Sequence, residues 1–172
     1  MEIRRLVESE WEAYRALRLE ALVNDPEAFG ADLTETKARP PESWIDRLKP
    51  NPNAFLLGAW EGSQLVGMVG FMRADGPKDQ HKGNLYSMYV TPAFRRGGTG
   101  RMLVKALLEA VRQLDGVSKV DLMVVTENES AIRLYESIGF VKYGREPRAL
   151  KAGDRYWDEY LMVYFLDGYT ME

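Results

Sequence analysis

The stretch Val90-Thr91-Pro92-Ala93-Phe94-Arg95-Arg96-Gly97-Gly98-Thr99-Gly100 joins an apolar strand pattern to a long amphipathic helix pattern. Its three glycines permit a tight turn and a close approach of the backbone to a bound group. The first N–H groups of the following helix have no partner inside it and carry the positive end of its dipole. Because Arg95, Arg96 and Arg101 add positive charge, the stretch predicts a phosphate or pyrophosphate site. The stretch alone leaves a second interpretation open, a glycine-rich turn with solvated arginines.

Two common phosphate-binding motifs are absent from this stretch. A P-loop requires Gly-Lys followed by Ser or Thr, and no such sequence follows the glycines. The dinucleotide fingerprint requires a third Gly or Ala after Gly98 and Gly100, and Leu103 stands at that place. The ligand is therefore expected to be neither a P-loop nucleotide nor a Rossmann dinucleotide.

Strand and helix patterns alternate on both sides of this stretch. Ser9 and Glu12 have capping-box spacing before a helix, residues 24–40 read as a polar loop, and Gly139 fits a helix C-cap. The pattern predicts one α+β domain over residues 1–172, with a mixed sheet of about six to seven strands and about four helices. Strands are expected at residues 2–7, 54–60, 65–72, 85–90, 120–125, from 140, and 159–165, and helices at 10–23, 41–48, 99–114 and 131–138.

The composition excludes several classes of protein. The absence of cysteine rules out a disulfide framework, a thiol nucleophile and a cysteine-type zinc site, and the single histidine, His81, rules out a histidine cluster, so no metal is expected. The formal net charge of −3 argues against a nucleic-acid surface. No apolar segment resembles a signal peptide or a membrane span, so a cytoplasmic protein without a membrane partner is expected.

At this point a resemblance becomes specific. The stretch from Val90 to Gly100 resembles the acyl-CoA motif of the GNAT (GCN5-related) N-acetyltransferase superfamily, with Arg95, Gly98 and Gly100 at its three defining places. A second signature of the same family follows about thirty residues later on the expected elements. It is formed by Asn128, Ala131, Leu134-Tyr135 and Gly139-Phe140.

The resemblance implies acetyl-CoA as the cofactor and a place for each of its parts. Backbone amides of the glycine-rich loop are expected to hold the coenzyme A diphosphate. The strand before the loop is expected to be splayed from its neighbour and to pair with the pantetheine arm, with one N–H stabilising the oxyanion. The cofactor-binding residues so assigned are Met88, Tyr89, Val90, Arg95, Arg96, Gly97, Gly98, Thr99, Gly100, Arg101 and Asn128.

Two of the motif residues also have a purely structural interpretation. Asn128 precedes a helix, where Asn is a favoured N-cap, whereas the family uses it to bind the coenzyme A arm. Tyr135 lies on the apolar stripe of the same helix and can be a core residue, whereas the family places its hydroxyl near the sulfur. The resemblance therefore implies Tyr135 as the catalytic acid that protonates the departing thiolate.

The acceptor is expected to be a primary amine on a small molecule or a peptide. In the family, the loop between the first two helices and the segment before the last strand shape its pocket. Aromatic side chains there can receive an ammonium group, although plain packing explains them equally well. The candidate substrate-binding residues are Phe29, Gly30, Tyr86, Tyr156 and Asp158.

The residue that accepts the amine proton is not identified by the sequence. Some family members carry Glu five residues before the motif Asn, where this chain has Met123, and this departure disfavours an acetylase of ribosomal-protein N-termini. Two alternatives stay open, a noncatalytic acyl-CoA-binding or regulatory module of the same fold, and a phosphate-binding protein with another ligand. The family also makes a homodimer possible.

Overall fold

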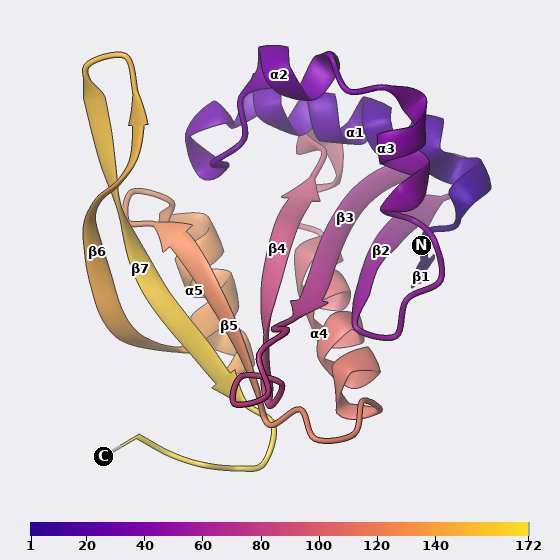
Figure 1. Cartoon of the computed structure of the whole chain (residues 1–172). Helices are drawn as coiled ribbons and strands as arrows, with labels where there is room; N and C mark the ends of the chain where they lie inside the picture. The colour runs from indigo at the N-terminus through magenta and orange to yellow at the C-terminus, as the bar shows by residue number, and fades with distance from the viewer. Residues whose placement is uncertain (172) are drawn as a thin grey trace.

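A mixed seven-stranded sheet in the order β1-β2-β3-β4-β5-β7-β6 forms the centre of the computed structural model, which describes residues 1–171 (Figure 1). All neighbouring strands are antiparallel except β4 and β5, which are parallel. The predicted fold class is therefore confirmed. The strands are β1 Glu2–Arg5, β2 Ala54–Glu61, β3 Gln64–Arg73, β4 Lys82–Val90, β5 Lys119–Val125, β6 Val141–Ala152 and β7 Arg155–Phe165.

Five α-helices cover the two faces of the sheet. Helices α1 Trp11–Asn24, α2 Leu33–Lys37 and α3 Pro41–Asp46 lie on one face, and α4 Thr99–Arg112 and α5 Glu129–Ile138 lie on the other (Figure 1). Each face has its own hydrophobic core, because apolar side chains alternate between the two faces of each central strand. One core contains Tyr14, Leu17, Trp44, Leu56 and Met68, and the other contains Val69, Phe71, Leu103, Leu107 and Met162.

Helix α2 replaces part of the polar loop predicted between residues 24 and 40. Its five residues include only one buried side chain, Thr36, so no apolar periodicity marks it. The Asp32 carboxylate caps the helix by accepting a hydrogen bond from the Glu35 N–H at 2.9 Å. The prediction of about four helices was one short for this reason.

The predicted capping box at Ser9 was wrong. Ser9 lies inside a 3₁₀ turn, Glu8–Glu10, and α1 begins only at Trp11. Glu10 holds this turn by accepting a hydrogen bond from the Val7 N–H at 3.0 Å and by pairing with Arg4 at 2.6 Å. Arg4 and the Val7 N–H bind different oxygens of the Glu10 carboxylate, so together they anchor the start of α1.

The two parallel strands separate along most of their length. Register pairs join β4 and β5 only from Lys82 with Lys119 to Asn84 with Asp121. Beyond these residues the strands diverge, as Figure 1 shows. The edge of β4 that faces β5 is consequently free of strand partners from Leu85 to Val90.

A β-bulge interrupts β4 within this unpaired part. Met68 of β3 pairs with Tyr89, but Gly70 pairs with Tyr86, so β4 contains one extra residue between these points. Ser87 has a left-handed φ of 53°, and neither Ser87 nor Met88 has a register partner on β3. Bulges redirect backbone groups and side chains, and they recur beside functional sites.

The hairpin of β6 and β7 extends beside the loop that follows α1. A second irregularity in this hairpin lies between Glu146 and Leu150, where Arg148 has a φ of 53°. A methyl group added to Gly30 would lie 3.6 Å from the Leu150 side chain, so the loop after α1 lies against β6. Among residues 1–171, no helix combines the length and apolar character needed to cross a membrane.

Candidate active site

A cavity of about 890 Å³ lies between the separated parts of β4 and β5. Besides these two strands, it is bordered by the start of α4, by α5 and by the segment that follows α1. It brings together most of the site residues that the sequence predicts, namely Phe29, Tyr86, Met88, Tyr89, Val90, Arg95, Arg96, Gly98, Gly100, Arg101, Asn128 and Tyr135. Gly30, Gly97, Thr99, Tyr156 and Asp158 are not among its lining residues.

The phosphate loop, defined here as Arg95–Gly98, is shaped to receive an anion. Arg96 and Gly98 have left-handed φ angles of 64° and 87°, and such alternation turns backbone N–H groups into a concave nest. Gly98 is the N-cap of α4, and no side chain caps this end of the helix. A methyl group added to Gly97 or Gly98 would meet no atom within 4 Å. Open amides, a helix N-terminus and free space therefore fit a diphosphate.

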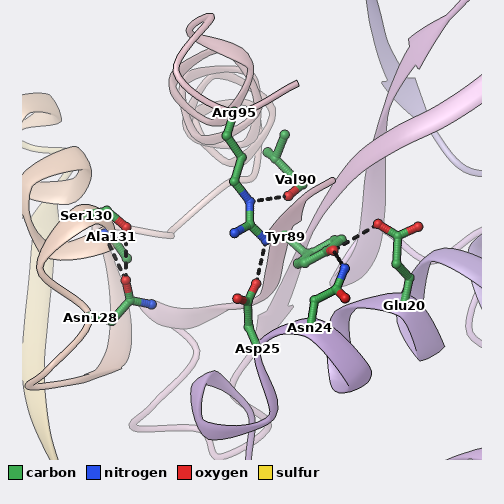
Figure 2. Close-up of polar contacts among 9 residues, drawn as sticks. All are labelled: Glu20, Asn24, Asp25, Tyr89, Val90, Arg95, Asn128, Ser130 and Ala131. Carbon is green, nitrogen blue, oxygen red and sulfur yellow. Dashed lines mark hydrogen bonds and ion pairs between the residues drawn. The ribbon is translucent and has the colours of Figure 1, made fainter. Parts of the chain in front are cut away.

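Arg95 is turned toward α1 rather than away from the protein. Its Nε donates to the Val90 carbonyl at 2.8 Å, and its guanidinium pairs with Asp25 at 2.5 Å (Figure 2). The same group lies 5.3 Å from the centre of the Tyr89 ring. Arg95 therefore holds the phosphate loop in place against the end of α1.

The other two arginines of the motif differ from Arg95. Arg101 donates to the Ser137 hydroxyl at 2.8 Å and so ties α4 to α5. Arg96 forms no ion pair or side-chain hydrogen bond with any residue between 1 and 171. Arg96 therefore differs from Arg101, which also forms no ion pair within the described chain, in that all its side-chain donors are available to a ligand.

Tyr89 fixes β4 to α1 through its side chain. Its hydroxyl donates to Glu20 at 2.9 Å and accepts from the Asn24 amide at 2.9 Å (Figure 2). Burial raises the pKa of Tyr89, and the hydrogen bond to Glu20 adds to the rise. The Tyr89 side chain is therefore engaged on α1, while the residue also lines the cavity.

Tyr135 is buried beneath the cleft on α5, with only 5% of its surface exposed. Its ring packs edge-on against Phe140 at a centroid distance of 5.6 Å. No side-chain hydrogen bond engages its hydroxyl within residues 1–171, and the residue lines the cavity. Burial raises the pKa of Tyr135 well above its usual value, so the phenol keeps its proton at neutral pH.

Asn128 has the helix-cap role that the sequence predicts, and its cofactor role stays a prediction. Its side-chain oxygen caps α5 by accepting from the Ala131 N–H at 3.2 Å, and it also accepts from the Ser130 hydroxyl at 3.2 Å. The amide nitrogen points away from these partners (Figure 2). Because the cap uses only the oxygen, the NH₂ group stays available to a ligand.

Several cavity residues were missed by the sequence analysis. Ser87 lies at the bulge, and Glu127 and Arg155 form an ion pair of 2.8 Å at the cavity wall. Glu27 also lines the cavity, from the 3₁₀ turn Pro26–Ala28. These residues come from loops and strand ends without a motif, so only the fold brings them together. Met123 lines the cavity with 58% of its surface exposed and offers no titratable group.

The candidate acceptor residues divide into two groups. Phe29 and Tyr86 line the cavity, whereas Asp158 is engaged within the hairpin of β6 and β7. The Asp158 carboxylate accepts from the Arg148 N–H at 2.8 Å and pairs with Arg145 at 2.5 Å, and these contacts lower its pKa. Tyr156 stacks on Arg148 at 4.8 Å with 42% of its surface exposed. For Gly30, Tyr156 and Asp158 an acceptor role stays a prediction.

A sheet that opens between two parallel strands above an uncapped helix N-terminus matches the fold that the sequence resemblance implies. The sequence model of the acetyltransferase (GNAT) family matches residues 4–140. The chain belongs to this family, so the predicted resemblance is confirmed.

Named relatives agree with this assignment. N-alpha-acetyltransferase RimI of Mycobacterium tuberculosis is 33% identical over 131 residues, covering 76% of this chain and 73% of that protein. Mycothiol acetyltransferase of Salinispora tropica is 30% identical over 132 residues, covering 77% of this chain and 41% of that protein. This chain thus spans less than half the length of the mycothiol acetyltransferases that it matches.

Solved structures share the fold along nearly the whole chain. A GNAT acetyltransferase from Streptococcus pneumoniae superposes with a TM-score of 0.82 at 21% identity, covering 96% of this chain and 99% of that one. The putative acetyltransferase yncA from Salmonella typhimurium, solved with its cofactor acetyl-CoA, has a TM-score of 0.83 at 21% identity and covers 100% of this chain and 97% of that one. At these identities the likeness establishes the fold.

Proposed function

We propose that this protein transfers the acetyl group of acetyl-CoA to the primary amine of a small molecule or a peptide. The observation that carries the proposal is the cleft itself. It has an open phosphate loop at one end, an unpaired strand edge along its wall, and the protonated Tyr135 beneath it. Family membership supports the same chemistry.

The chain offers one group for each part of the cofactor. The backbone amides from Arg96 to Arg101 hold the diphosphate, and the Arg96 side chain adds charge. The free edge of β4 at Met88, Tyr89 and Val90 pairs with the amide groups of the pantetheine arm as an added strand does. The NH₂ group of Asn128 donates to the same arm from the opposite wall. When bound, acetyl-CoA supplies the activated thioester that the amine attacks.

Two features of the chain act on the reacting atoms. A backbone N–H near the bulge at Ser87 and Met88 polarises the thioester carbonyl, and a donor so aimed contributes roughly 3 kcal/mol to lowering the barrier. The Tyr135 hydroxyl protonates the departing sulfur, since its phenol is neutral and lacks a competing partner within the described chain. Met123 supplies no base, so the amine proton passes to solvent or, through water, to a carboxylate of the cavity such as Glu27.

An acetyl-CoA-dependent amine screen tests the proposal. The protein is incubated with acetyl-CoA and a panel of amines, and both coenzyme A release and product mass are measured. Acetylated product for at least one amine class is expected. Binding of acetyl-CoA without product from any amine would support the noncatalytic module instead. Calorimetry with acetyl-CoA, ATP and NAD separates these results from a general phosphate site, which would bind all three.

A further inference from the structure

Three buried polar atoms on α1 and α2 lack hydrogen-bond partners. They are the Tyr14 hydroxyl, Nη1 of Arg18 and the Thr36 hydroxyl, and they make up most of the orphaned side-chain atoms in residues 1–171. A buried polar group without a partner destabilises the fold, so such groups are rare unless a ligand or water completes their hydrogen bonds. The clustering of these atoms in one pair of packed helices points to an occupant that supplies the missing acceptors.

Two of these atoms, on Tyr14 and Arg18 of α1, lie behind residues that line the cleft. Tyr14 and Arg18 are one helical turn apart, so their side chains share a face of α1. The Arg18 guanidinium lies 4.5 Å from the centre of the Phe29 ring, and Phe29 lines the cavity. Tyr86, which also lines the cavity, lies over Gly70 so closely that a methyl group there would be 2.6 Å from its ring. Phe29 and Tyr86 thus form an aromatic wall of the cleft that lies directly beside Arg18.

The charge at this place is positive and uncompensated. Arg18 and its two basic neighbours Arg39 and Arg47 take part in no ion pair between residues 1 and 171. Burial lowers the pKa of Arg18, and the charges of Arg47 and Arg39 lower it further. The same burial raises the pKa of Tyr86, so its hydroxyl remains a hydrogen-bond donor. Three guanidinium groups and two phenols without a carboxylate form an environment for an anion.

We propose that Arg18, with the Tyr14 and Tyr86 hydroxyls, binds a carboxylate of the acceptor, so that the acceptor is an amine of the amino-acid class. The proposal rests on the acetyl transfer proposed above. A guanidinium matches a carboxylate with two parallel hydrogen bonds, and the aromatic wall accommodates the carbon skeleton between the two charged groups. A polyamine or an aminoglycoside would place further positive charge beside three arginines, which disfavours these acceptors.

Matched acceptors test the proposal directly. L-amino acids, their primary amides and the corresponding decarboxylated amines are compared as acceptors at a fixed acetyl-CoA concentration. The acids are expected to react with a kcat/KM about 10- to 100-fold higher than their amides, the usual effect of losing hydrogen bonds to a charged group. Equal kcat/KM values for acids and amides would overturn the proposal.

Variants of α1 show whether Arg18 is responsible. Arg18→Gln should remove the preference for acids while leaving the rates with amides and the acetyl-CoA affinity within about twofold. Arg15→Gln is the matched control on the same helix, because its guanidinium only reaches the Lys37 carbonyl at 3.4 Å. If Arg18→Gln folds poorly, Tyr14→Phe replaces it as the test variant, because it removes only one oxygen atom without a hydrogen-bond partner. It should also reduce the preference for acids. An equal loss of kcat/KM with acids and amides would show that Arg18 acts only through the stability of the fold.

A binding measurement separates this proposal from the proposed function. Calorimetry with amino acids and N-acetylated amino acids needs no turnover. Binding that is lost in Arg18→Gln and kept in Arg15→Gln supports the carboxylate site even if the amine screen finds no product. The absence of binding by both ligand sets, alongside measurable acetylation of other amines, would refute the carboxylate site and leave the acetyltransferase proposal intact.

Discussion

The Arg95 guanidinium lies 2.5 Å from the Asp25 carboxylate, and this pair joins the phosphate loop to the end of α1. The same side chain donates to the Val90 carbonyl at 2.8 Å, so it spans the turn between β4 and the loop. The motif resemblance assigns Arg95 to cofactor binding, but its contacts are internal. We therefore propose that Arg95 influences acetyl-CoA binding indirectly, by fixing the left-handed turn at Arg96 and Gly98.

Arg95→Gln is expected to weaken acetyl-CoA binding several-fold without lowering kcat at saturation, because the amides of the loop lose their fixed orientation. The exposed ion pair itself contributes only about 1 kcal/mol or less to stability, so the melting temperature should change little. Dissociation constants from calorimetry provide the measurement. Asp25→Asn distinguishes positioning of the loop by Arg95 from direct contact of Arg95 with the phosphates. If Arg95 acts by positioning, Asp25→Asn should weaken acetyl-CoA binding as Arg95→Gln does. Tighter binding in Asp25→Asn would instead mean that Arg95 contacts the phosphates.

Tyr135→Phe is expected to lower kcat by about 100-fold and to leave acetyl-CoA affinity unchanged, because only the proton donor is removed. The ring keeps its packing against Phe140, so the fold is retained. Steady-state kinetics and calorimetry on the same preparations measure both effects. A kcat equal to that of the wild type, with the chemical step shown to limit turnover, would remove Tyr135 from the mechanism.

The same substitution should change stability at alkaline pH. Because burial raises the pKa of Tyr135 in the folded state, the neutral phenol favours folding below the ordinary tyrosine pKa near 10. As the pH rises above this value, the unfolded chain ionises first and the wild type loses stability. Tyr135→Phe lacks this ionisation, so its melting temperature should fall less between pH 8 and pH 11. If the melting temperatures of the wild type and Tyr135→Phe fall equally with pH, the ionisation of Tyr135 does not affect stability.

Gly98→Ala should weaken acetyl-CoA binding through backbone strain. Gly98 has a φ of 87°, where a non-glycine residue costs about 1–2 kcal/mol, and no atom lies within 4 Å of an added methyl group. Gly62→Ala is the matched control, because Gly62 has a φ of 58° and equally open surroundings in the turn between β2 and β3. Both variants should lose similar stability, and only Gly98→Ala should lose affinity. Unchanged affinity in Gly98→Ala would mean that the loop tolerates another conformation.

Features that depend on local pattern could be predicted from the sequence. The amphipathic repeat of α4 and the left-handed Gly139 at the end of α5 appear where they were expected. The bulge in β4 could not be predicted, because its left-handed residue is Ser87 and no glycine marks the turn. Its position depends on how β3 and β4 pair, which is a property of the sheet rather than of either strand.

Residues around the cavity that belong to no motif are brought together by contacts between distant segments. Arg18 reads as an ordinary polar position on an amphipathic helix, yet its guanidinium is buried against Phe29. Glu127 and Arg155 are far apart in the sequence and meet only because β5 and β7 are neighbours. Motif spacing therefore predicted the cavity residues around the phosphate loop and α5, whereas the residues of the opposite wall became apparent only in the assembled fold.

Asp158→Asn is expected to loosen the irregular part of β6, because the Asp158 carboxylate accepts from the Arg148 N–H and pairs with Arg145. These contacts lower the pKa of Asp158, so their stabilisation is present above the ordinary aspartate pKa near 4. It is lost as the pH falls through the lower pKa of the folded state.

The difference in melting temperature between the wild type and Asp158→Asn should therefore be largest near neutral pH and shrink below about pH 4. Hydrogen exchange at the Arg148 amide gives a local readout and should accelerate in the variant. Asp154→Asn, in the turn of the same hairpin, is the control, since Asp154 forms no ion pair or side-chain hydrogen bond with the described residues. A pH-independent difference would show that the carboxylate charge is not what holds the strand. A raised KM for the amine in Asp158→Asn would instead support the acceptor role predicted for this residue.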